Sequence, residues 1–360
     1  MAYMLQREGV EFYSYLVGYS TRKAVVDSET LCGLKLSYQS RYIFTENGTE
    51  CASSCNITSA IYPLIKEPVK CRVRSDLRAK DLSNIRKFAE GTNAIVYLVE
   101  FEGKEVIMKM IKKTFENNRY VVAEFETERL ILERSSHQNI IKIIGAGNDP
   151  RKFILLEYLN EGTLADILAK NQSQTKLGRI FFPRVTFSWP ELLRRALELA
   201  EALKYLHEDC FKDSTIIHRD LKPDNIGFVD GKLKLFDMGL SICVAKSANP
   251  SDAFEMTGCT GTLRYMAPEV ALNKPYSEKS DVYSYGIISW QMASDRVPFK
   301  GAGKKAFYEW VVKNGLRPDL RASWPKEFRD LLAACWQSDA SKRPTFSNVR
   351  YILLKLQKAT

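Results

Sequence analysis

One short run of polar residues carries most of the chemistry that this sequence offers. Residues 218–225 read His-Arg-Asp-Leu-Lys-Pro-Asp-Asn, which places two acids, a lysine and an amide in one loop. A further acid, Asp237, follows a short apolar stretch and begins an Asp-Met-Gly turn. Asn225 and Asp237 carry hard oxygen donors, which suit a hard divalent cation.

This pattern resembles the catalytic loop and the metal-binding turn of eukaryotic protein kinases. The resemblance extends from about residue 80 to the C-terminus. It implies that Asp220 orients the substrate hydroxyl and accepts its proton, and that Asn225 and Asp237 hold Mg²⁺ against the phosphates of ATP. Lys222 resembles the lysine of serine/threonine kinases that touches the γ-phosphate. An ordinary polar loop is the weaker interpretation, because the Asp-Met-Gly turn follows at the expected distance.

A lysine on a predicted strand, Lys109, matches the kinase lysine that anchors the α- and β-phosphates. A lone lysine on a strand is usually solvated, so its partner matters. Glu128 lies within the apolar stripe of the following helix, and a charge turned toward a core needs an opposite charge. Glu128 is therefore the predicted partner of Lys109, with Glu124 as the alternative. Glu126 and Glu133 lie off the stripe and are predicted to be solvated.

The loop that would cover the phosphates departs from the family pattern. Residues 89–96 align with Gly-x-Gly-x-x-Gly-x-Val but keep only the middle glycine, Gly91. Ala89 and Ala94 replace the other two glycines, while Val96 is retained. Gly91 still allows the backbone to approach a phosphate closely. The departure favours, as an alternative, a pseudokinase that binds nucleotide or partners with weak or no catalysis.

The resemblance also implies an adenine pocket of unusual composition. Ile107 stands where the family commonly has alanine above the ring, and Gly227 stands where a larger apolar residue commonly lies below it. Our hypothesis is that the adenine slot is displaced, because the larger side chain of Ile107 on one side of the ring is compensated by the missing side chain of Gly227 on the other. Glu157 and Leu159 resemble the hinge residues whose backbone pairs with adenine. Leu156 occupies the gatekeeper position and is also consistent with a core residue.

Downstream motifs resemble the peptide-binding part of a kinase. Residues 261–265 read Gly-Thr-Leu-Arg-Tyr, a form typical of serine/threonine specificity, and residues 267–269 read Ala-Pro-Glu. Glu269 is predicted to form a buried ion pair with Arg343. Asp281 is predicted to accept hydrogen bonds from the backbone of the catalytic loop.

The segment between Asp237 and Glu269 is rich in serine and threonine. A phosphate there would meet Arg219, which in activation-dependent kinases contacts one. Thr257 and Thr260 are the preferred acceptors. Thr262 is expected to position the substrate instead.

The elements expected around these residues give an α+β, two-lobed protein kinase fold. The small lobe is mainly antiparallel β with one helix, and the large lobe is mainly α-helical. Helical periodicity predicts a buried helix over 193–207, and a stretch that is apolar on nearly all sides predicts another over 281–292. The small-lobe elements are predicted as strands 85–89, 95–100, 105–111, 140–145 and 153–158 and a helix over about 118–135.

The predicted kinase domain spans 79–358, with its small lobe at about 79–158 and its large lobe at about 159–358. Residues 1–78 are assigned to an N-terminal extension of unknown role, with one or two strands around 33–44. A zinc site or a disulfide is a minor alternative within this extension. Its four cysteines are Cys32, Cys51, Cys55 and Cys71.

Composition narrows the function classes further. The formal charge is +10, but the basic residues are dispersed, which disfavours a nucleic-acid partner. No apolar run reaches the roughly 18 residues that a membrane span needs. No basic stretch followed by an apolar one marks a signal peptide, so a cytoplasmic protein is expected.

The sequence is identified as a member of the serine/threonine protein kinases, similar to the tyrosine-kinase-like group. The resemblance implies Mg²⁺-dependent transfer of the ATP γ-phosphoryl group to a serine or threonine hydroxyl of a protein substrate. A small-molecule kinase is a weaker alternative, because the segment 261–269 resembles a peptide platform.

Overall fold

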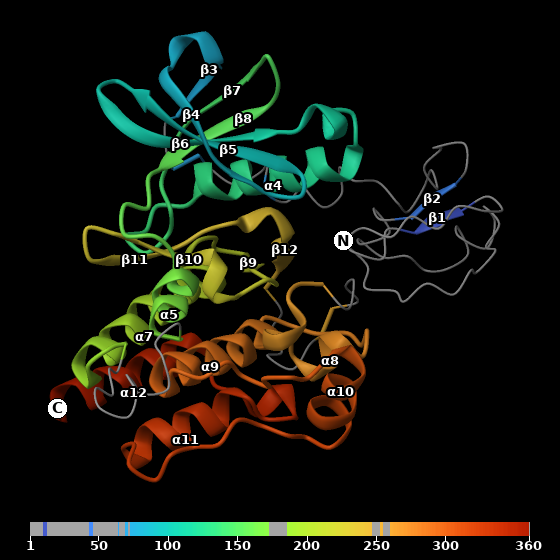
Figure 1. The fold of residues 1–360 in the computed structure, drawn as a ribbon. Coiled ribbons are helices and arrows are strands. Elements are labelled where there is room, and N and C mark those ends of the chain that lie inside the picture. The colour runs from blue at the N-terminus through green and yellow to red at the C-terminus, as the bar shows by residue number, and fades with distance from the viewer. Residues whose placement is uncertain are drawn as a thin grey trace. The chain divides into compact units, whose positions relative to one another are not determined.

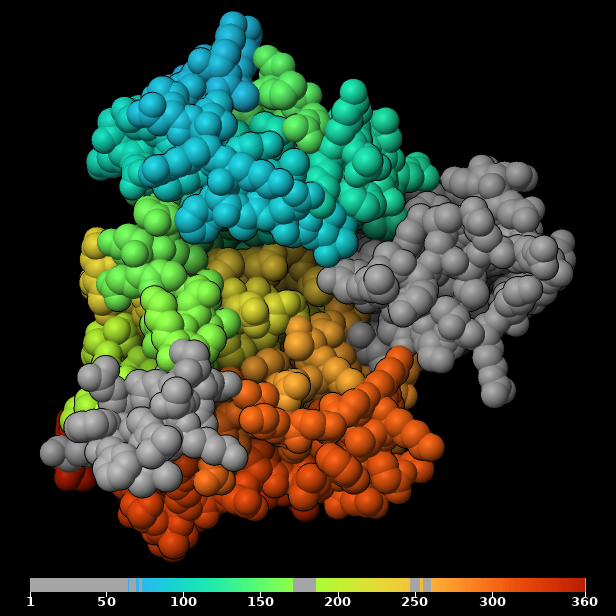
Figure 2. Space-filling model, viewed as in Figure 1, coloured from blue at the N-terminus to red at the C-terminus, as the bar shows by residue number. Residues whose placement is uncertain are grey.

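Contacts within the computed structural model divide the chain into two compact units, coloured along the chain in Figure 1 and Figure 2. The first unit comprises residues 1–160 and 236–244, and the second comprises 161–235 and 245–360. The structure describes residues 10–12, 43–45, 64, 69–70, 73–172, 186–246, 253–254 and 260–359.

A six-stranded sheet with the order β3-β7-β8-β6-β5-β4 forms the first unit. All neighbouring strands are antiparallel except β3 and β7, which are parallel. A separate antiparallel pair joins β1 (Val10–Phe12) to β2 (Ile43–Thr45). The strands of the sheet are β3 (Arg74–Arg78), β4 (Ser83–Glu90), β5 (Ala94–Phe101), β6 (Lys104–Ile111), β7 (Ile143–Asp149) and β8 (Phe153–Glu157).

The alternation of side chains along β6 assigns its two faces to different tasks. Met108 and Met110 are buried in a cluster that includes Leu77 and Phe153. Because neighbouring residues of a strand point to opposite faces, Lys109 lies on the other face. That face is where α4 (Arg119–Arg134) contacts β6 and β7. The strand therefore presents Lys109 to the helix.

The N-terminus of α4 is defined by a side-chain cap. Asn118 Oδ1 accepts hydrogen bonds from the backbone N–H groups of Tyr120 and Val121 at 3.1 and 3.2 Å. Such a cap satisfies N–H groups that have no partner within the helix. The cap sets where the helix begins and hence which residues face the sheet.

A second stretch of chain, 236–244, belongs to the same unit. Its short helical turn, η6 (Met238–Leu240), packs against α4, and the Met238 side chain is fully buried. The strand β12 (Ile242–Ala245) follows. This packing holds the Asp-Met-Gly turn beside the helix that carries Glu128.

The second unit is mainly helical (Figure 1). Every residue of α9 (Lys279–Ser294) is buried, as expected of a helix that is apolar on nearly all sides. A hairpin joins β10 (Ile226–Val229) to β11 (Lys232–Leu235). The other elements are β9 (Ser214–Ile217), α5 (Leu164–Gln172), α7 (Trp189–Lys204), α8 (Pro268–Ala271), α10 (Lys304–Phe307), α11 (Lys326–Cys335) and α12 (Phe346–Ala359).

The predicted α+β fold class is confirmed. The strand predicted over 140–145 is instead β7, which starts later, because Ile140 N–H donates to the His137 carbonyl and closes a turn there. The strand β3 lies in the segment assigned to the N-terminal extension. The domain boundaries themselves stay a prediction.

Several expectations concern residues outside the described ranges. Residues 33–42 lie outside them, as do the four cysteines of the N-terminal segment, so the zinc or disulfide alternative stays untested. Among the described cysteines, Cys210, Cys243 and Cys335 are buried and form no disulfide with one another. Within the described part of the chain, no helix combines the length and the apolar character of a membrane span.

Candidate active site

The first unit brings together three of the predicted site residues. Lys109 Nζ donates to Glu128 Oε2 at 2.7 Å and to Asp237 Oδ1 at 2.9 Å. The Glu128 side chain is 2% exposed, whereas that of Asp237 is 40% exposed. A single cation therefore joins β6, α4 and the Asp-Met-Gly turn, and one carboxylate of the trio stays open to solvent.

Opposing charges decide the ionisation of this trio. Burial acts to lower the pKa of Lys109, but the carboxylates of Asp237 and Glu128 outweigh it and raise that pKa. Burial raises the pKa of Glu128, while the positive charge of Lys109 opposes the change. Lys109 is therefore held as a cation at every physiological pH, which is the form that attracts phosphate.

Among the glutamates of α4, Glu128 is the partner of Lys109, as its place on the apolar stripe predicted. The exposure of a neighbouring glutamate differs from the prediction. Glu133 was predicted to be solvated and is instead buried, with Arg129 Nη1 at 2.6 Å. Glu126 accepts from Arg129 and from Lys152 at 2.8 and 2.6 Å. The prediction of solvated side chains was wrong because flanking arginine and lysine residues supply counter-charges. A buried carboxylate is tolerated when it is paired in this way.

The glycine of the predicted phosphate loop is not required by the fold. Gly91 N–H donates to the Ala94 carbonyl at 2.9 Å, closing the turn between β4 and β5. A Cβ built at Gly91 would meet its nearest neighbour, the Ala94 carbonyl oxygen, at 3.6 Å, which is an ordinary contact. Glu90 in the same turn pairs with Lys112 at 2.7 Å, and hydrogen bonds from Lys112 and Lys87 lower the pKa of Glu90 to about 2.

The second unit contains a network around Asp220, which is 6% exposed. Lys222 Nζ lies 2.5 Å from its Oδ2, and Thr262 Oγ1 donates to its Oδ1 at 2.9 Å. Asn225 Nδ2 donates to the Asp220 carbonyl at 2.9 Å. Because the nitrogen of this amide is the donor, Asn225 Oδ1 is left as an acceptor.

The backbone of this loop is held by a buried carboxylate. Asp281 accepts from the N–H groups of His218 and Arg219 at 2.8 and 3.0 Å, as predicted. His207 Nε2 lies 2.9 Å from Asp281 Oδ2. Arg219 adopts a φ of 71°, a left-handed conformation that costs energy for a non-glycine residue. The carboxylate of Asp281 helps to offset this cost by accepting from the N–H of Arg219 itself and from that of the residue before it.

A close backbone approach explains the glycine of the Gly-Thr-Leu-Arg-Tyr segment. Gly261 has a φ of 97°, and a Cβ there would lie 2.4 Å from the Arg219 carbonyl oxygen. Only glycine fits this position without a shift. This close approach places the next residue, Thr262, within hydrogen-bond distance of Asp220.

The predicted ion pair of the Ala-Pro-Glu motif is also present. Arg343 donates to both carboxylate oxygens of Glu269, at 2.5 and 2.9 Å. The arginine side chain is fully buried, and its Nη1 also donates to the Lys279 carbonyl at 3.0 Å. A bidentate, buried pair fixes both geometry and position.

Comparison with known proteins agrees with this geometry. The family model described as "Protein kinase domain" matches residues 82–351. The chain belongs to the protein kinase family. The predicted recognition is therefore confirmed.

Named relatives of this kinase chain point the same way. It is 31% identical over 298 residues to the serine/threonine-protein kinase VIK of Arabidopsis thaliana, covering 81% of this chain and 64% of that protein. It is 32% identical over 283 residues to the serine/threonine/tyrosine-protein kinase HT1 of the same plant, covering 76% and 67%. It is 30% identical over 298 residues to human mitogen-activated protein kinase kinase kinase 7, covering 82% and 45%. The chain thus spans only part of each relative.

The residues predicted to surround adenine lie on elements of both units of this kinase. Leu156 is 4% exposed and pairs with Ile107 between β8 and β6. Glu157 Oε1 accepts from Lys142 N–H at 2.7 Å, so its side chain closes the start of β7. Gly227 pairs with Lys234 in the β10–β11 hairpin, and Leu159 is half-buried.

Two contacts of this kinase escaped the sequence analysis. His207 was counted only as the end of a helix, and its bond to Asp281 joins residues 74 positions apart. Phe88 packs edge-on against Tyr158 with ring centroids 5.9 Å apart. Phe88 is nevertheless 56% exposed, which is unusual for an aromatic residue.

Proposed function

We propose that this chain is an active serine/threonine protein kinase that transfers the γ-phosphoryl group of ATP to a protein hydroxyl. The observation that carries the proposal is the double contact of Lys109 with Glu128 and Asp237. Phosphoryl transfer depends on positioned charge more than on covalent help from the protein. A chain that had lost catalysis would have no need to hold this charge trio together.

The donor set suits magnesium. Asp237 offers a partly exposed carboxylate and Asn225 offers an amide oxygen, both of them hard ligands. When bound, Mg²⁺ would neutralise charge on the phosphates. Lys109 would bind the α- and β-phosphates from its face of β6, oriented by Glu128.

In the transfer step, Asp220 would act on the substrate hydroxyl. Its carboxylate accepts the hydroxyl proton as the new O–P bond forms and the bond between the γ-phosphorus and the bridging oxygen of ADP breaks. Lys222 contacts this carboxylate and carries a positive charge that suits the transferred phosphoryl group. Thr262, on the other oxygen of Asp220, orients the carboxylate.

Serine/threonine specificity is the finer part of the proposal. Lys222 and Thr262 both contact Asp220, and both belong to patterns that resemble serine/threonine kinases. The names of two of the relatives, VIK and HT1, include serine/threonine, and that of HT1 also includes tyrosine. The protein substrate is thus expected to present a serine or threonine hydroxyl. We further infer that the kinase domain spans 79–358.

The test is transfer of labelled phosphate from ATP to a peptide library, with Asp220→Asn as the variant. Loss of the base should lower kcat by about 10²–10⁴-fold. Asp224→Asn in the same loop is exposed and serves as the matched control with unchanged activity. No transfer by the parent protein, with a melting temperature raised by ATP and Mg²⁺, would instead establish the pseudokinase alternative.

A phosphate on the activation segment would meet Arg219. Its Nη2 donates to Thr260 Oγ1 at 3.0 Å, which supports Thr260 as an acceptor site. Thr257 lies outside the described residues. Mass spectrometry of active protein that found no phosphate on this segment would contradict activation by phosphorylation.

The displaced adenine slot has its own test. We expect the missing side chain at Gly227 to make room for an adenine ring that the larger side chain of Ile107 displaces. A leucine at position 227 would occupy that room. Gly227→Leu is expected to weaken ATP binding at least about tenfold, the scale of a steric misfit of 1–3 kcal/mol. Titration calorimetry that found equal affinity would show that the slot is not displaced.

A further inference from the structure

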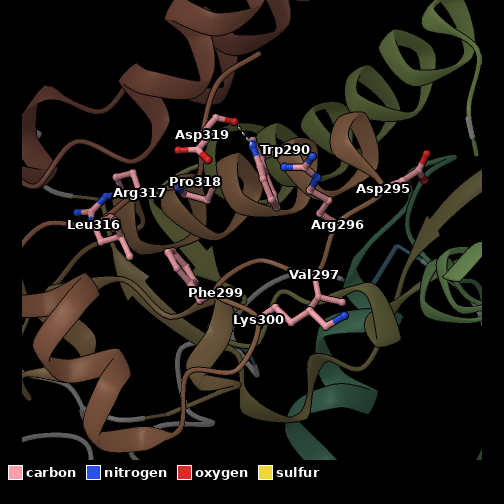
Figure 3. Close-up of a pocket in the computed structure, with 10 residues that line it drawn as sticks. All are labelled: Trp290, Asp295, Arg296, Val297, Phe299, Lys300, Leu316, Arg317, Pro318 and Asp319. Atoms are coloured by element: carbon pink, nitrogen blue, oxygen red, sulfur yellow. Dashed lines mark hydrogen bonds between the residues drawn. The ribbon is translucent and has the colours of Figure 1, made fainter. Parts of the chain in front are cut away.

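A pocket of about 530 Å³ opens in the second unit, away from the residues of the Asp220 network. Its walls come from the C-terminal half of α9 and from the segments 295–300 and 316–319 (Figure 3). This volume falls within the range of ligand pockets, about 300–1,000 Å³. None of its lining residues takes part in the mechanism proposed above.

The floor of the pocket is apolar and fixed. Trp290 is 5% exposed, and its Nε1 donates to the Asp319 carbonyl at 2.8 Å. Figure 3 shows this bond and places Phe299 and Pro318 beside the indole. A rigid aromatic floor of this kind suits a bulky apolar side chain as an anchor.

The apolar surface continues beyond the pocket. Leu316 on the rim is 47% exposed, and its N–H donates at 2.8 Å to the carbonyl of Trp310, which is 44% exposed. A small molecule is usually buried by 70–90% or so in its site. Two large, half-exposed side chains next to the opening therefore favour an extended polypeptide over a small molecule.

The charge of the rim selects the type of polypeptide. Residues 296–305 contain four cations and no acid. These cations, Arg296, Lys300, Lys304 and Lys305, are exposed and form no ion pair with any residue that the structure describes. An unpaired positive rim attracts acidic segments and speeds their association.

The anionic groups of the pocket do not cancel this field. Asp295 accepts hydrogen bonds from the N–H and hydroxyl of Thr186, and Figure 3 shows its carboxylate directed away from Trp290. Asp319 is an exposed acid at the opposite end from Lys300. Arg317 is a structural cation, because its guanidinium donates to the carbonyls of Trp336 and Val311.

We propose that this pocket docks a linear segment of a partner protein in which a bulky apolar residue is flanked by acidic residues. The apolar residue would enter between Trp290, Phe299 and Leu316. The acidic residues would meet Arg296 and Lys300 on the rim. Such a site would recruit the partner independently of the residues that perform phosphoryl transfer.

The test measures fluorescence anisotropy of a labelled peptide in which a leucine–phenylalanine pair is flanked by glutamates, without ATP. Because no phosphoryl transfer is involved, the outcome is independent of the proposed kinase activity. The peptide should bind the full chain, and raising the salt from about 0.05 to 0.5 M should weaken binding several-fold. A peptide with lysines in place of the glutamates should bind at least about tenfold more weakly.

Two variants test the two halves of the site. Lys300→Glu and Leu316→Ser change exposed side chains, and each should weaken binding about tenfold without lowering the melting temperature. Lys358→Glu makes the same charge change at an exposed position of α12 and is the matched control with unchanged affinity. Failure of the acidic peptide to bind, or equal binding by the parent and both variants, overturns the proposal.

Other occupants give different results. A dimer of the parent protein in sedimentation velocity that Leu316→Ser dissociates would make this face a self-interface. Co-sedimentation with phosphatidylserine vesicles that Lys300→Glu abolishes would make it a membrane surface. Either result also overturns docking of an acidic partner segment.

Discussion

At the scale of single residues, one buried carboxylate organises the candidate site. Glu128 is 2% exposed, yet it faces a cation that is itself shared with Asp237. Taking a carboxylate out of water is costly unless a counter-charge repays it. Lys109 supplies this charge, so the lysine and the glutamate each position the other.

Glu128→Gln is expected to lower kcat/KM roughly tenfold or more, which corresponds to about 1.4 kcal/mol of transition-state stabilisation. The amide keeps the shape of the side chain but no longer balances the charge of Lys109. The measurement is steady-state kinetics with peptide and ATP. Glu126→Gln on the same helix, whose carboxylate pairs with Arg129 and Lys152, is the matched control. Equal losses in both variants would contradict a specific role of Glu128.

Gly91→Val is expected to raise KM for ATP about tenfold with an unchanged melting temperature. The fold has room for a Cβ at this position, with 3.6 Å to the nearest atom, so the effect would come from the bound nucleotide alone. Thr92→Val changes the neighbouring exposed residue and is the control. A fall in melting temperature would show that the glycine serves the fold instead.

At the scale of elements, three segments of the second unit converge on Asp220. The loop 218–225 carries it, α9 holds the loop backbone through Asp281, and the segment 260–265 supplies Thr262. The close approach of Gly261 to the Arg219 carbonyl lets the segment 260–265 meet the loop 218–225. Secondary structure alone would not bring them together.

Gly261→Ala is expected to destabilise the fold by about 1–3 kcal/mol, because alanine is strained at positive φ. The added Cβ would also clash with the Arg219 carbonyl oxygen, so Thr262 would move and activity would fall. Gly303→Ala is the control, since a Cβ there meets no atom within 4 Å. The measurements are thermal unfolding and peptide phosphorylation. A fully active, equally stable variant would contradict the argument.

At the scale of the whole molecule, the order of residues along the chain does not follow their division between the two units. Lys109, Glu128 and Asp237 belong to the first unit, although Asp237 follows the catalytic loop by only about a dozen residues. The segment 236–244 leaves the helical unit because Met238 is buried against α4. Each unit thereby holds its own set of the residues that we propose for the chemistry.

Acid should destabilise the folded chain through Asp281. Burial acts to raise the pKa of Asp281, but the hydrogen bond and charge of His207 and the backbone N–H of Arg219 outweigh it and lower that pKa. Since the unfolded carboxylate titrates near about 3.9, the stabilisation is present above that pH and is lost as the pH falls through the lower folded value.

Asp281→Asn should cost about 1–3 kcal/mol at neutral pH and progressively less below about pH 4. Denaturant unfolding from neutral to acidic pH measures this difference. Asp319→Asn removes an exposed carboxylate from the same unit and should change stability by less than about 0.5 kcal/mol at each pH. A constant difference between the parent and Asp281→Asn across this range would contradict the prediction.

Local patterns in the sequence determined which residues we propose for the chemistry. Asp220, Asn225 and Asp237 were predicted from the resemblance of their motifs to those of kinases, and Glu128 from its phase on a helix, because these signals depend only on neighbours along the chain. The pairing of Arg343 with Glu269 was also anticipated from motifs.

Only the tertiary structure decided several other contacts of buried groups. Glu133 is buried against Arg129, His207 meets Asp281, and Gly261 touches the carbonyl of Arg219. The last two contacts join residues far apart along the chain, and all three depend on side-chain reach and on the space left by neighbouring elements. Periodicity reports which face of an element is apolar, but the partner of a charge on that face is set by packing.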